Sequence, residues 1–220
     1  MKNLLCLLLA GALVFSTAAC GSSTRDSEAE ADNTEMAAEE TTVSEDTSEQ
    51  SVREEAETEN GQNILIAYFS WSGNTEELAG MIQSETGGEL FEIEPAEPYT
   101  EDYDALLDQA QQEQRENARP ELAAQVENWD SYDVIFVGYP NWWSDAPMAV
   151  LSFLESYDCT GKTIVPFNTS GGGGFGNSLA SIEESAAGAE ILEGFTVAGD
   201  NVSSAQADVN EWISSLGLAQ

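Results

Sequence analysis

The sequence predicts an α/β fold for residues 61–220, in which a parallel sheet is covered by helices in a three-layer arrangement. Short apolar runs alternate along this part of the chain with amphipathic stretches, a pattern typical of strands connected by helices. The apolar runs are nearly continuous and rich in β-branched and aromatic residues, as expected of strands buried on both faces. The length suits one domain.

Five runs are predicted strands, in the order Ile64–Phe69, Glu89–Glu94, Val134–Gly138, Thr163–Phe167 and Ile191–Val197. Apolar residues at helical spacing predict four helices, which contain Leu78, Met81 and Ile82, then Leu106, Leu107 and Ala110, then Val150, Leu151 and Leu154, and finally Val209, Trp212, Ile213 and Leu216. We interpret these stripes as core.

The insertion Pro95–Asp133, between the second and third predicted strands, is long for a single crossover. The stretch "DYDALLDQAQQEQREN" within it predicts one helix over residues 102–117. Pro120 predicts the start of a second, short helix, because proline suits the first turn of a helix.

Residues 1–20 have the pattern of a secretory signal, with one lysine, an apolar segment from Leu4 to Phe15 and then small residues. Two interpretations of its end stay open. The chain can be cleaved after Ala19, or Cys20 can accept a lipid, because "STAACGSS" resembles the lipobox of bacterial lipoproteins. We favour the lipoprotein, which would be exported and anchored at the outer face of the cytoplasmic membrane.

Residues 21–60 consist mostly of Ser, Thr, Glu, Asp and Ala, and contain no aromatic residue. Such a segment buries too little apolar surface to offset the entropy of ordering, so we predict a disordered acidic linker. Residues 61–220 are then one folded domain.

The chain carries 41 acidic and 6 basic residues and no histidine, for a formal charge of -35. Residues 61–220 alone hold 27 acidic residues against Arg115, Arg119 and Lys162, so the domain itself is acidic. Nucleic-acid binding is excluded, because it depends on Lys and Arg. The absence of histidine excludes Ser-His-Asp triads and His-ligated zinc, and we expect no metal site. Cys159 is interpreted as a structural thiol.

The segment "SWSGNT" (70–75) joins the first predicted strand to the first helix. Ligands of such sheets bind beyond the carboxyl ends of the strands, where this segment lies. Ser70, Ser72 and Thr75 carry hydroxyls, Gly73 allows close backbone approach, and a helix start offers free N–H groups. These groups could bind a phosphate without Lys or Arg. The same residue types also serve as ordinary turn and cap residues.

Two further loops follow the third and fourth predicted strands. In "GYPNWWSDAP", Trp142 and Trp143 stand where a polar turn is expected, which favours stacking on a planar ring, although one of them could instead cap the sheet. In "NTSGGGGFGNS", Gly171–Gly174 could place N–H groups against a ligand, or could simply form a hinge.

The segments "YFSWSGNTEELA", "YDVIFVGYPNWWSDAPMAVLSFLE" and "GKTIVPFNTSGGGGFGNSL" together resemble the flavodoxin family, in its bacterial branch with paired tryptophans. The resemblance implies a flavodoxin-like doubly wound five-stranded sheet in the order 2-1-3-4-5, with FMN as the cofactor. It further implies that Ser70, Trp71, Ser72, Gly73, Asn74 and Thr75 bind the ribityl phosphate. Pro140, Asn141, Trp142 and Trp143 would line one side of the isoalloxazine, and Thr169, Ser170, Gly171, Gly172 and Gly173 its other edge.

We expect a low-potential electron carrier, because electron transfer needs no acid or base from the protein and an acidic surrounding disfavours the last reduction. Its redox partners should have basic docking surfaces. One alternative is an FMN-dependent NAD(P)H:quinone oxidoreductase, which would need positive groups for the nucleotide. Another is a flavin-free surface lipoprotein that binds a ligand or protein.

Overall fold

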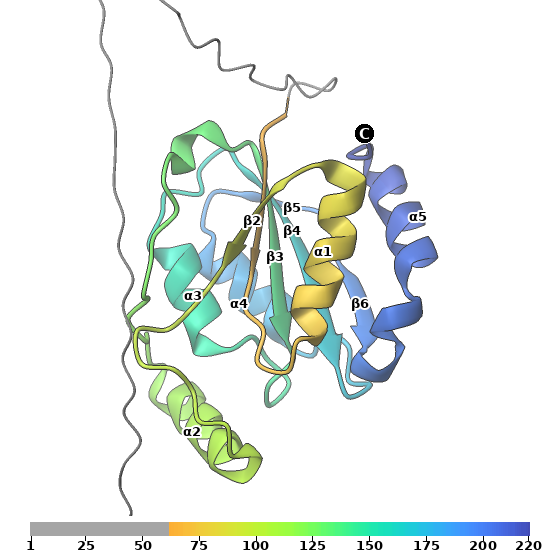
Figure 1. Cartoon of the computed structure of the whole chain (residues 1–220). Coiled ribbons are helices and arrows are strands. Elements are labelled where there is room, and N and C mark those ends of the chain that lie inside the picture. Colours follow the sequence, from red (N-terminus) through yellow and green to blue (C-terminus); the bar gives the residue numbers. More distant parts are fainter. Residues whose placement is uncertain (1–61) are drawn as a thin grey trace, which may run out of the picture. The chain divides into compact units, whose positions relative to one another are not determined.

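A parallel sheet forms the centre of the computed structural model, which describes residues 62–220 (Figure 1). Its strands follow the order β2-β1-β3-β4-β5, and β6 also pairs with β4. All of these pairs are parallel. The strands are β1 (Ile64–Tyr68), β2 (Glu89–Glu92), β3 (Val134–Pro140), β4 (Thr163–Ser170), β5 (Glu190–Ile191) and β6 (Phe195–Ala198). The predicted α/β class and strand order are confirmed.

The fifth predicted strand is not continuous, because β5 and β6 occupy one edge of β4 with a break between them. The N–H of Leu192 donates to the Ile164 carbonyl at 2.9 Å. The next residue of β4 whose backbone groups point toward the same neighbouring strand is Pro166. Proline has no N–H to donate to the neighbouring strand, so the ladder stops there. Pairing resumes at Phe195, opposite Phe167.

Four helices cover the two faces of the sheet (Figure 1). α3 (Met148–Glu155) and α4 (Ser178–Ser185) lie on one face, and α1 (Asn74–Thr86) and α5 (Gln206–Leu216) lie on the other. The side chains of β1 alternate accordingly, since Leu65 and Ala67 join the cluster under α3 and α4, whereas Ile66 and Tyr68 join the other. The central strands β1, β3 and β4 are therefore buried on both faces, whereas β2, β5 and β6 are partly exposed.

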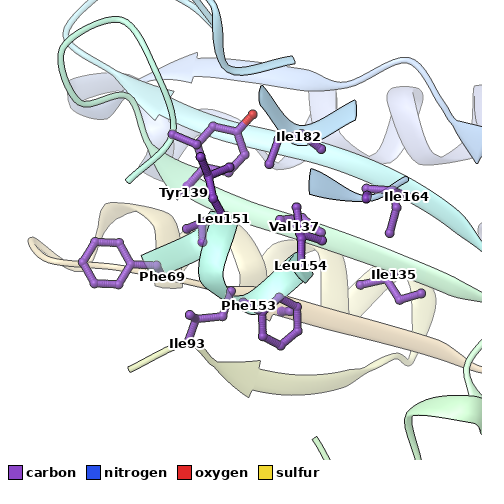
Figure 2. Close-up of a cluster of buried hydrophobic side chains, with 14 of the residues drawn as sticks. Phe69, Ile93, Ile135, Val137, Tyr139, Leu151, Phe153, Leu154, Ile164 and Ile182 are labelled. Carbon is purple, nitrogen blue, oxygen red and sulfur yellow. The ribbon is translucent and has the colours of Figure 1, made fainter. Parts of the chain in front are cut away.

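Figure 2 shows the cluster under α3 and α4. Phe153 is fully buried in it, with its ring centroid 5.7 Å from that of Phe91 and 5.9 Å from that of Trp129. Tyr139 is also fully buried, and its hydroxyl lies 3.0 Å from Ser178 Oγ. Tyr139 therefore packs beneath the loop that follows it, and burial raises the pKa of its hydroxyl, which stays neutral.

α2 (Tyr103–Glu116) lies beyond the ends of the strands instead of on a face of the sheet (Figure 1). Its prediction is confirmed, with Asp102 as the N-cap that accepts a hydrogen bond from the Ala105 N–H at 2.9 Å. α2 buries only Leu106 and Ala110. It therefore contributes little to the main core, and side-chain hydrogen bonds join it to the domain, from Trp143 Nε1–H to the Leu107 carbonyl and from the Tyr99 hydroxyl to Glu113.

The predicted second helix at Pro120 is wrong. The segment instead runs alongside Pro95, with an antiparallel bridge between Pro95 and Leu122. The N–H of Ala96 donates to the Glu121 carbonyl and that of Ala123 donates to the Glu94 carbonyl. These backbone groups are used across the insertion, so they cannot form helical bonds. A short 3-10 helix follows only at Trp129–Ser131.

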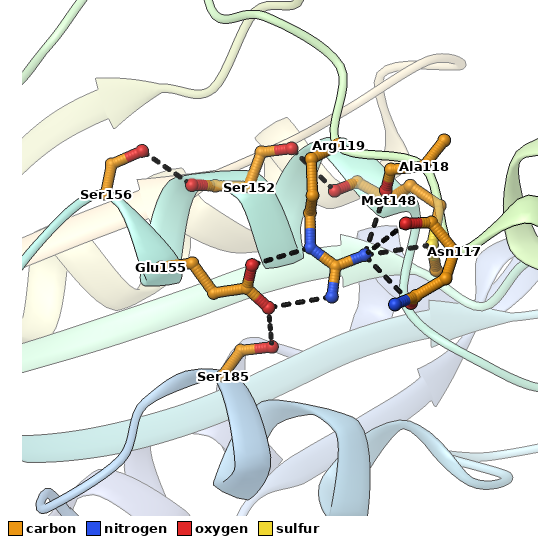
Figure 3. Close-up of polar contacts among 8 residues, drawn as sticks. All are labelled: Asn117, Ala118, Arg119, Met148, Ser152, Glu155, Ser156 and Ser185. Atoms are coloured by element: carbon orange, nitrogen blue, oxygen red, sulfur yellow. Dashed lines mark hydrogen bonds and ion pairs between the residues drawn. The ribbon is translucent and has the colours of Figure 1, made fainter.

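An ion pair fastens the segment after α2 to the rest of the domain (Figure 3). Arg119 donates from Nε and Nη2 to the two carboxylate oxygens of Glu155 on α3, at 2.7 Å each. Ser185 of α4 also donates to Glu155, at 3.0 Å. The Arg119 guanidinium lowers the pKa of Glu155. One pair thus joins the insertion to α3 and α4.

Replacing Glu155 by Gln should lower the free energy of unfolding by about 0.5–1 kcal/mol at pH 7, since the pair is bidentate but partly exposed. The pKa of Glu155 is lower in the folded chain, so its contribution is present above the ordinary glutamate pKa and is lost as pH falls through the lowered value. Urea unfolding should therefore show a larger difference between the native chain and the variant at pH 7 than at about pH 3. Glu183→Gln, an exposed change on α4, is the control. An equal loss at both pH values would contradict the assignment.

The predicted signal segment 1–20, Cys20 and the predicted linker 21–60 lie outside the described residues. Within residues 62–220, no helix combines the length and the apolar character that crossing a membrane requires.

Candidate functional site

Three loops meet at the carboxyl edge of the sheet. They follow β1, β3 and β4, which are neighbours with parallel register, so that Tyr68 lies opposite Gly138 and Pro140 lies opposite Thr169. The N–H of Asn141 donates to the Thr169 carbonyl at 2.8 Å, which joins two of the loops directly. A cavity of about 700 Å³ opens between the loops and α2. Its size is that of a small-molecule site.

Ten of the fifteen predicted site residues line this cavity. They are Trp71, Ser72, Asn74, Pro140, Asn141, Trp142, Trp143, Thr169, Ser170 and Gly171. The other five lie outside the cavity lining, in the same loops or, for Thr75, in the first turn of α1; they are Ser70, Gly73, Thr75, Gly172 and Gly173. Their assignment as ligand contacts stays a prediction.

The loop after β1 forms a helix start with free N–H groups. Gly73 precedes α1 with φ 87°, a left-handed conformation that suits glycine, and its N–H donates to Ser70 Oγ at 3.2 Å. The first helical bond runs from the Glu77 N–H to the Gly73 carbonyl, so the N–H groups of residues 74–76 have no acceptor within the helix. Ser70 therefore shapes the turn, and the helix start is available for an anion.

Thr75 and Thr169 connect this loop to the one after β4. Both side chains are buried, and their Oγ1 atoms lie 3.0 Å apart. Thr169 also lines the cavity, whereas Thr75 does not. In the structure, the hydroxyl of Thr75 positions the two loops relative to each other.

The paired tryptophans occupy a tight turn after β3. Trp142 and Asp145 exchange backbone hydrogen bonds of 2.9 and 3.0 Å across it. Trp143 and Ser144, at its centre, have φ values of 51° and 64°, which is costly for residues other than glycine. The N–H of Asn177 donates to the Ser144 carbonyl at 2.7 Å and helps hold the turn.

The two indoles have different surroundings. Trp142 is partly buried and meets the rings of Phe69 and Tyr99 edge-on, at 5.2 and 5.1 Å between centroids. Trp143 is 45% exposed, and its Nε1–H donates to the Leu107 carbonyl of α2 at 2.9 Å. Trp142 thus lines the cavity and packs against the rings of Phe69 and Tyr99. Trp143 also lines the cavity, and its hydrogen bond joins the tryptophan turn to α2.

The glycine-rich loop after β4 is organised around Ser170, whose Oγ accepts from the N–H groups of Gly172 and Gly174 at 3.2 and 3.1 Å. Asn168 donates to the Gly174 carbonyl at 3.2 Å. A Cβ added at Gly171 or Gly172 would meet no atom within 4 Å, so this backbone borders open space. These hydrogen bonds define a fixed conformation of the loop, so the loop is not a simple hinge.

Comparison with known proteins agrees with this geometry. A family model described as Flavodoxin matches residues 63–216. The chain belongs to the flavodoxin family. Comparison with curated proteins found no match.

Solved structures similar to this flavodoxin-family chain include two from Bacteroides. A candidate flavoprotein from Bacteroides eggerthii DSM 20697 is 33% identical with a TM-score of 0.63, over 70% of this chain and 98% of that one. Another, from Bacteroides uniformis ATCC 8492, is 30% identical with a TM-score of 0.63, over the same shares. A flavoprotein from Lactobacillus acidophilus NCFM, crystallised in complex with FMN, is 25% identical with a TM-score of 0.55, over 69% and 98%.

Seven further lining residues were not predicted from the sequence. Tyr103, Leu106, Leu107 and Ala110 come from α2, and Ala198, Gly199 and Asp200 follow β6. From the sequence we interpret the apolar residues of α2 as core, because helical spacing does not show where a helix packs. Residues 198–200 follow the end of the fifth predicted strand, and this position alone indicates that they could lie at the ligand-binding edge of the sheet.

No cation lines the cavity among the described residues. Arg119 binds Glu155, Arg115 hydrogen-bonds Gln111 on α2, and Lys162 donates to the carbonyls of Trp129 and Tyr132. Residues 62–220 also contain no cluster of three or more potential metal ligands. Hydroxyl and N–H groups are thus the donors that this site offers to an anion.

Replacing Ser144 by Gly should raise the free energy of unfolding by about 0.5–1 kcal/mol, because it relieves a positive φ and this gain exceeds the added entropy of the unfolded chain. Chemical denaturation measures the change. Ser203→Gly is the matched control, since Ser203 is exposed and has no positive φ, and should be destabilising. A similar response at both serines would contradict strain in the tryptophan turn.

Proposed function

We propose that this chain binds FMN in the cavity and works as an electron carrier. The observation that carries the proposal is the meeting of a donor-rich helix start with an aromatic turn in one cavity of about 700 Å³. Family membership supports it, as does the FMN complex of the Lactobacillus relative.

The residues present fit this cofactor. Ser72, Asn74 and the N–H groups at the start of α1 would hold the phosphate, because hydroxyls and a helix N-terminus bind anions without a cation. Pro140–Trp143 would lie against the ring, and Thr169–Gly171 along its edge. When bound, FMN supplies the redox chemistry, and the protein sets its potential through packing, hydrogen bonds and charge.

Neither alternative gains support from the site. An NAD(P)H:quinone oxidoreductase would need positive groups near the cavity for the nucleotide phosphates, and Arg115, Arg119 and Lys162 lie outside the lining. A flavin-free binding protein would have no need for a donor-rich turn beside exposed tryptophan. A steady-state NAD(P)H oxidation assay with quinone acceptors separates an enzyme from a carrier.

The purified full chain, incubated with FMN and freed of excess, should retain the visible absorption bands of flavin. Ser72→Ala should weaken FMN binding by about tenfold, as expected for one lost hydrogen bond to a charged group. Ser84→Ala, at an exposed position of α1 outside the cavity lining, is the control. A chain that stays colourless after incubation would contradict the proposal.

The last reduction of the bound flavin should occur about 50–100 mV below that of free FMN, because it adds negative charge inside an acidic domain without a nearby cation. Potentiometric titration with reference dyes measures this shift. High salt should reduce the shift by screening the surface charges. A potential above that of free FMN would count against a low-potential carrier.

We further propose that the domain docks with basic redox partners and is tethered outside the cytoplasmic membrane through Cys20. The net charge and the signal pattern support these points. In cells fed labelled palmitate, the native chain should be labelled and sediment with membranes. Cys20→Ser should lose both properties, and a labelled Cys20→Ser chain would contradict lipidation at this residue.

A further inference from the structure

Asp200 introduces a negative charge into the end of the cavity that is rich in anion donors. Asp200 lines the same cavity as Ser72 and Asn74, and it is the one charged side chain among the described residues of that lining. It is exposed, and it lies in the first turn of the 3-10 helix Gly199–Ser204 that follows β6. The charge therefore faces solvent and cavity instead of the core.

Strand pairing and a close backbone contact place Asp200 beside the start of α1. β6 pairs with β4, so that Ala198 lies opposite Ser170 of the glycine-rich loop. The next residue, Gly199, approaches Asn74 so closely that an added Cβ would lie 2.7 Å from Asn74 Nδ2. Asn74 is the first residue of α1. Asp200 thus follows directly on a residue in contact with the helix start.

The charge of Asp200 is not neutralised by a neighbour. No hydrogen bond or ion pair joins its carboxylate to another of residues 62–220, and Arg115, Arg119 and Lys162 are engaged elsewhere. Glu76 and Glu77, in the first turn of α1, are exposed and carry the same sign. An anion at the start of α1 would therefore meet donors on one side and an uncompensated carboxylate on the other.

We propose that Asp200 is a specificity-determining residue, which lowers the preference of this site for a phosphorylated over an unphosphorylated flavin. The proposal rests on the proposed function of the cavity. The donors of the helix start favour the phosphate, and Asp200 opposes it through the repulsion of like charges. Riboflavin has no phosphate, so its affinity should not depend on the charge at position 200.

The experiment compares the dissociation constants of FMN and riboflavin, measured by quenching of flavin fluorescence on the native full chain and its variants. Asp200→Asn removes the charge at constant size, and Asp200→Glu keeps it. Asp208→Asn is the matched control, because Asp208 is an exposed first-turn aspartate on α5 outside the cavity lining. Each titration is run at about 20 mM and about 0.5 M salt.

Asp200→Asn should tighten FMN binding by about three- to tenfold at low salt and by less at high salt, with riboflavin unchanged. Asp200→Glu and Asp208→Asn should behave like the native chain. Equal effects on both flavins, no effect, or weaker binding of FMN would each overturn the role of Asp200. If the native chain bound neither flavin, both the proposed function and this inference would fail. If the native chain bound FMN and Asp200→Asn had no selective effect, only this inference would fail, so the two failures are distinguishable.

Discussion

The parallel register of β1, β3 and β4 is the constraint on which the site depends. It places the ends of three neighbouring strands at one edge of the sheet, where the loops that follow them meet and form hydrogen bonds with one another. The register is held because both faces of these strands are buried in separate apolar clusters, and a slip of one residue would move every side chain to the wrong face. Gly138 belongs to the same constraint, since an added Cβ there would fall on the ring of Phe167 in β4.

An anion site in so acidic a domain must work with weak and directional donors. The few cations among residues 62–220 are used for structure, Arg119 to fasten the insertion and Lys162 to bind two backbone carbonyls. Hydroxyls and helix N–H groups act over short distances, so their positions matter more than those of a lysine would. The buried pair of Thr75 and Thr169 and the turn around Ser170 supply that precision of placement. At such a site, a single nearby carboxylate such as that of Asp200 is expected to alter the preference between ligands.

Local patterns in the sequence predict the first four strands, α2 and the three loops, because apolar runs and turn residues depend on their immediate surroundings. They could not reveal that α2 lies beyond the strand ends and forms a wall of the cavity, since that depends on Trp143 and Arg119 reaching residues far along the chain. Pro120 was misread as a helix start because its neighbours pair with the distant segment around Pro95. The break in the fifth strand has its cause in Pro166, on a different strand. The short helix α4 has few apolar residues and was not assigned from the sequence.

A crystal structure of the chain grown with FMN would show directly how the cavity holds the flavin. We expect the phosphate at Ser72, Asn74 and the first N–H groups of α1, with the ring between the tryptophan turn and Thr169–Gly171. Flavin bound outside the cavity, or turned so that its phosphate lies against Trp142 and Trp143, would contradict it.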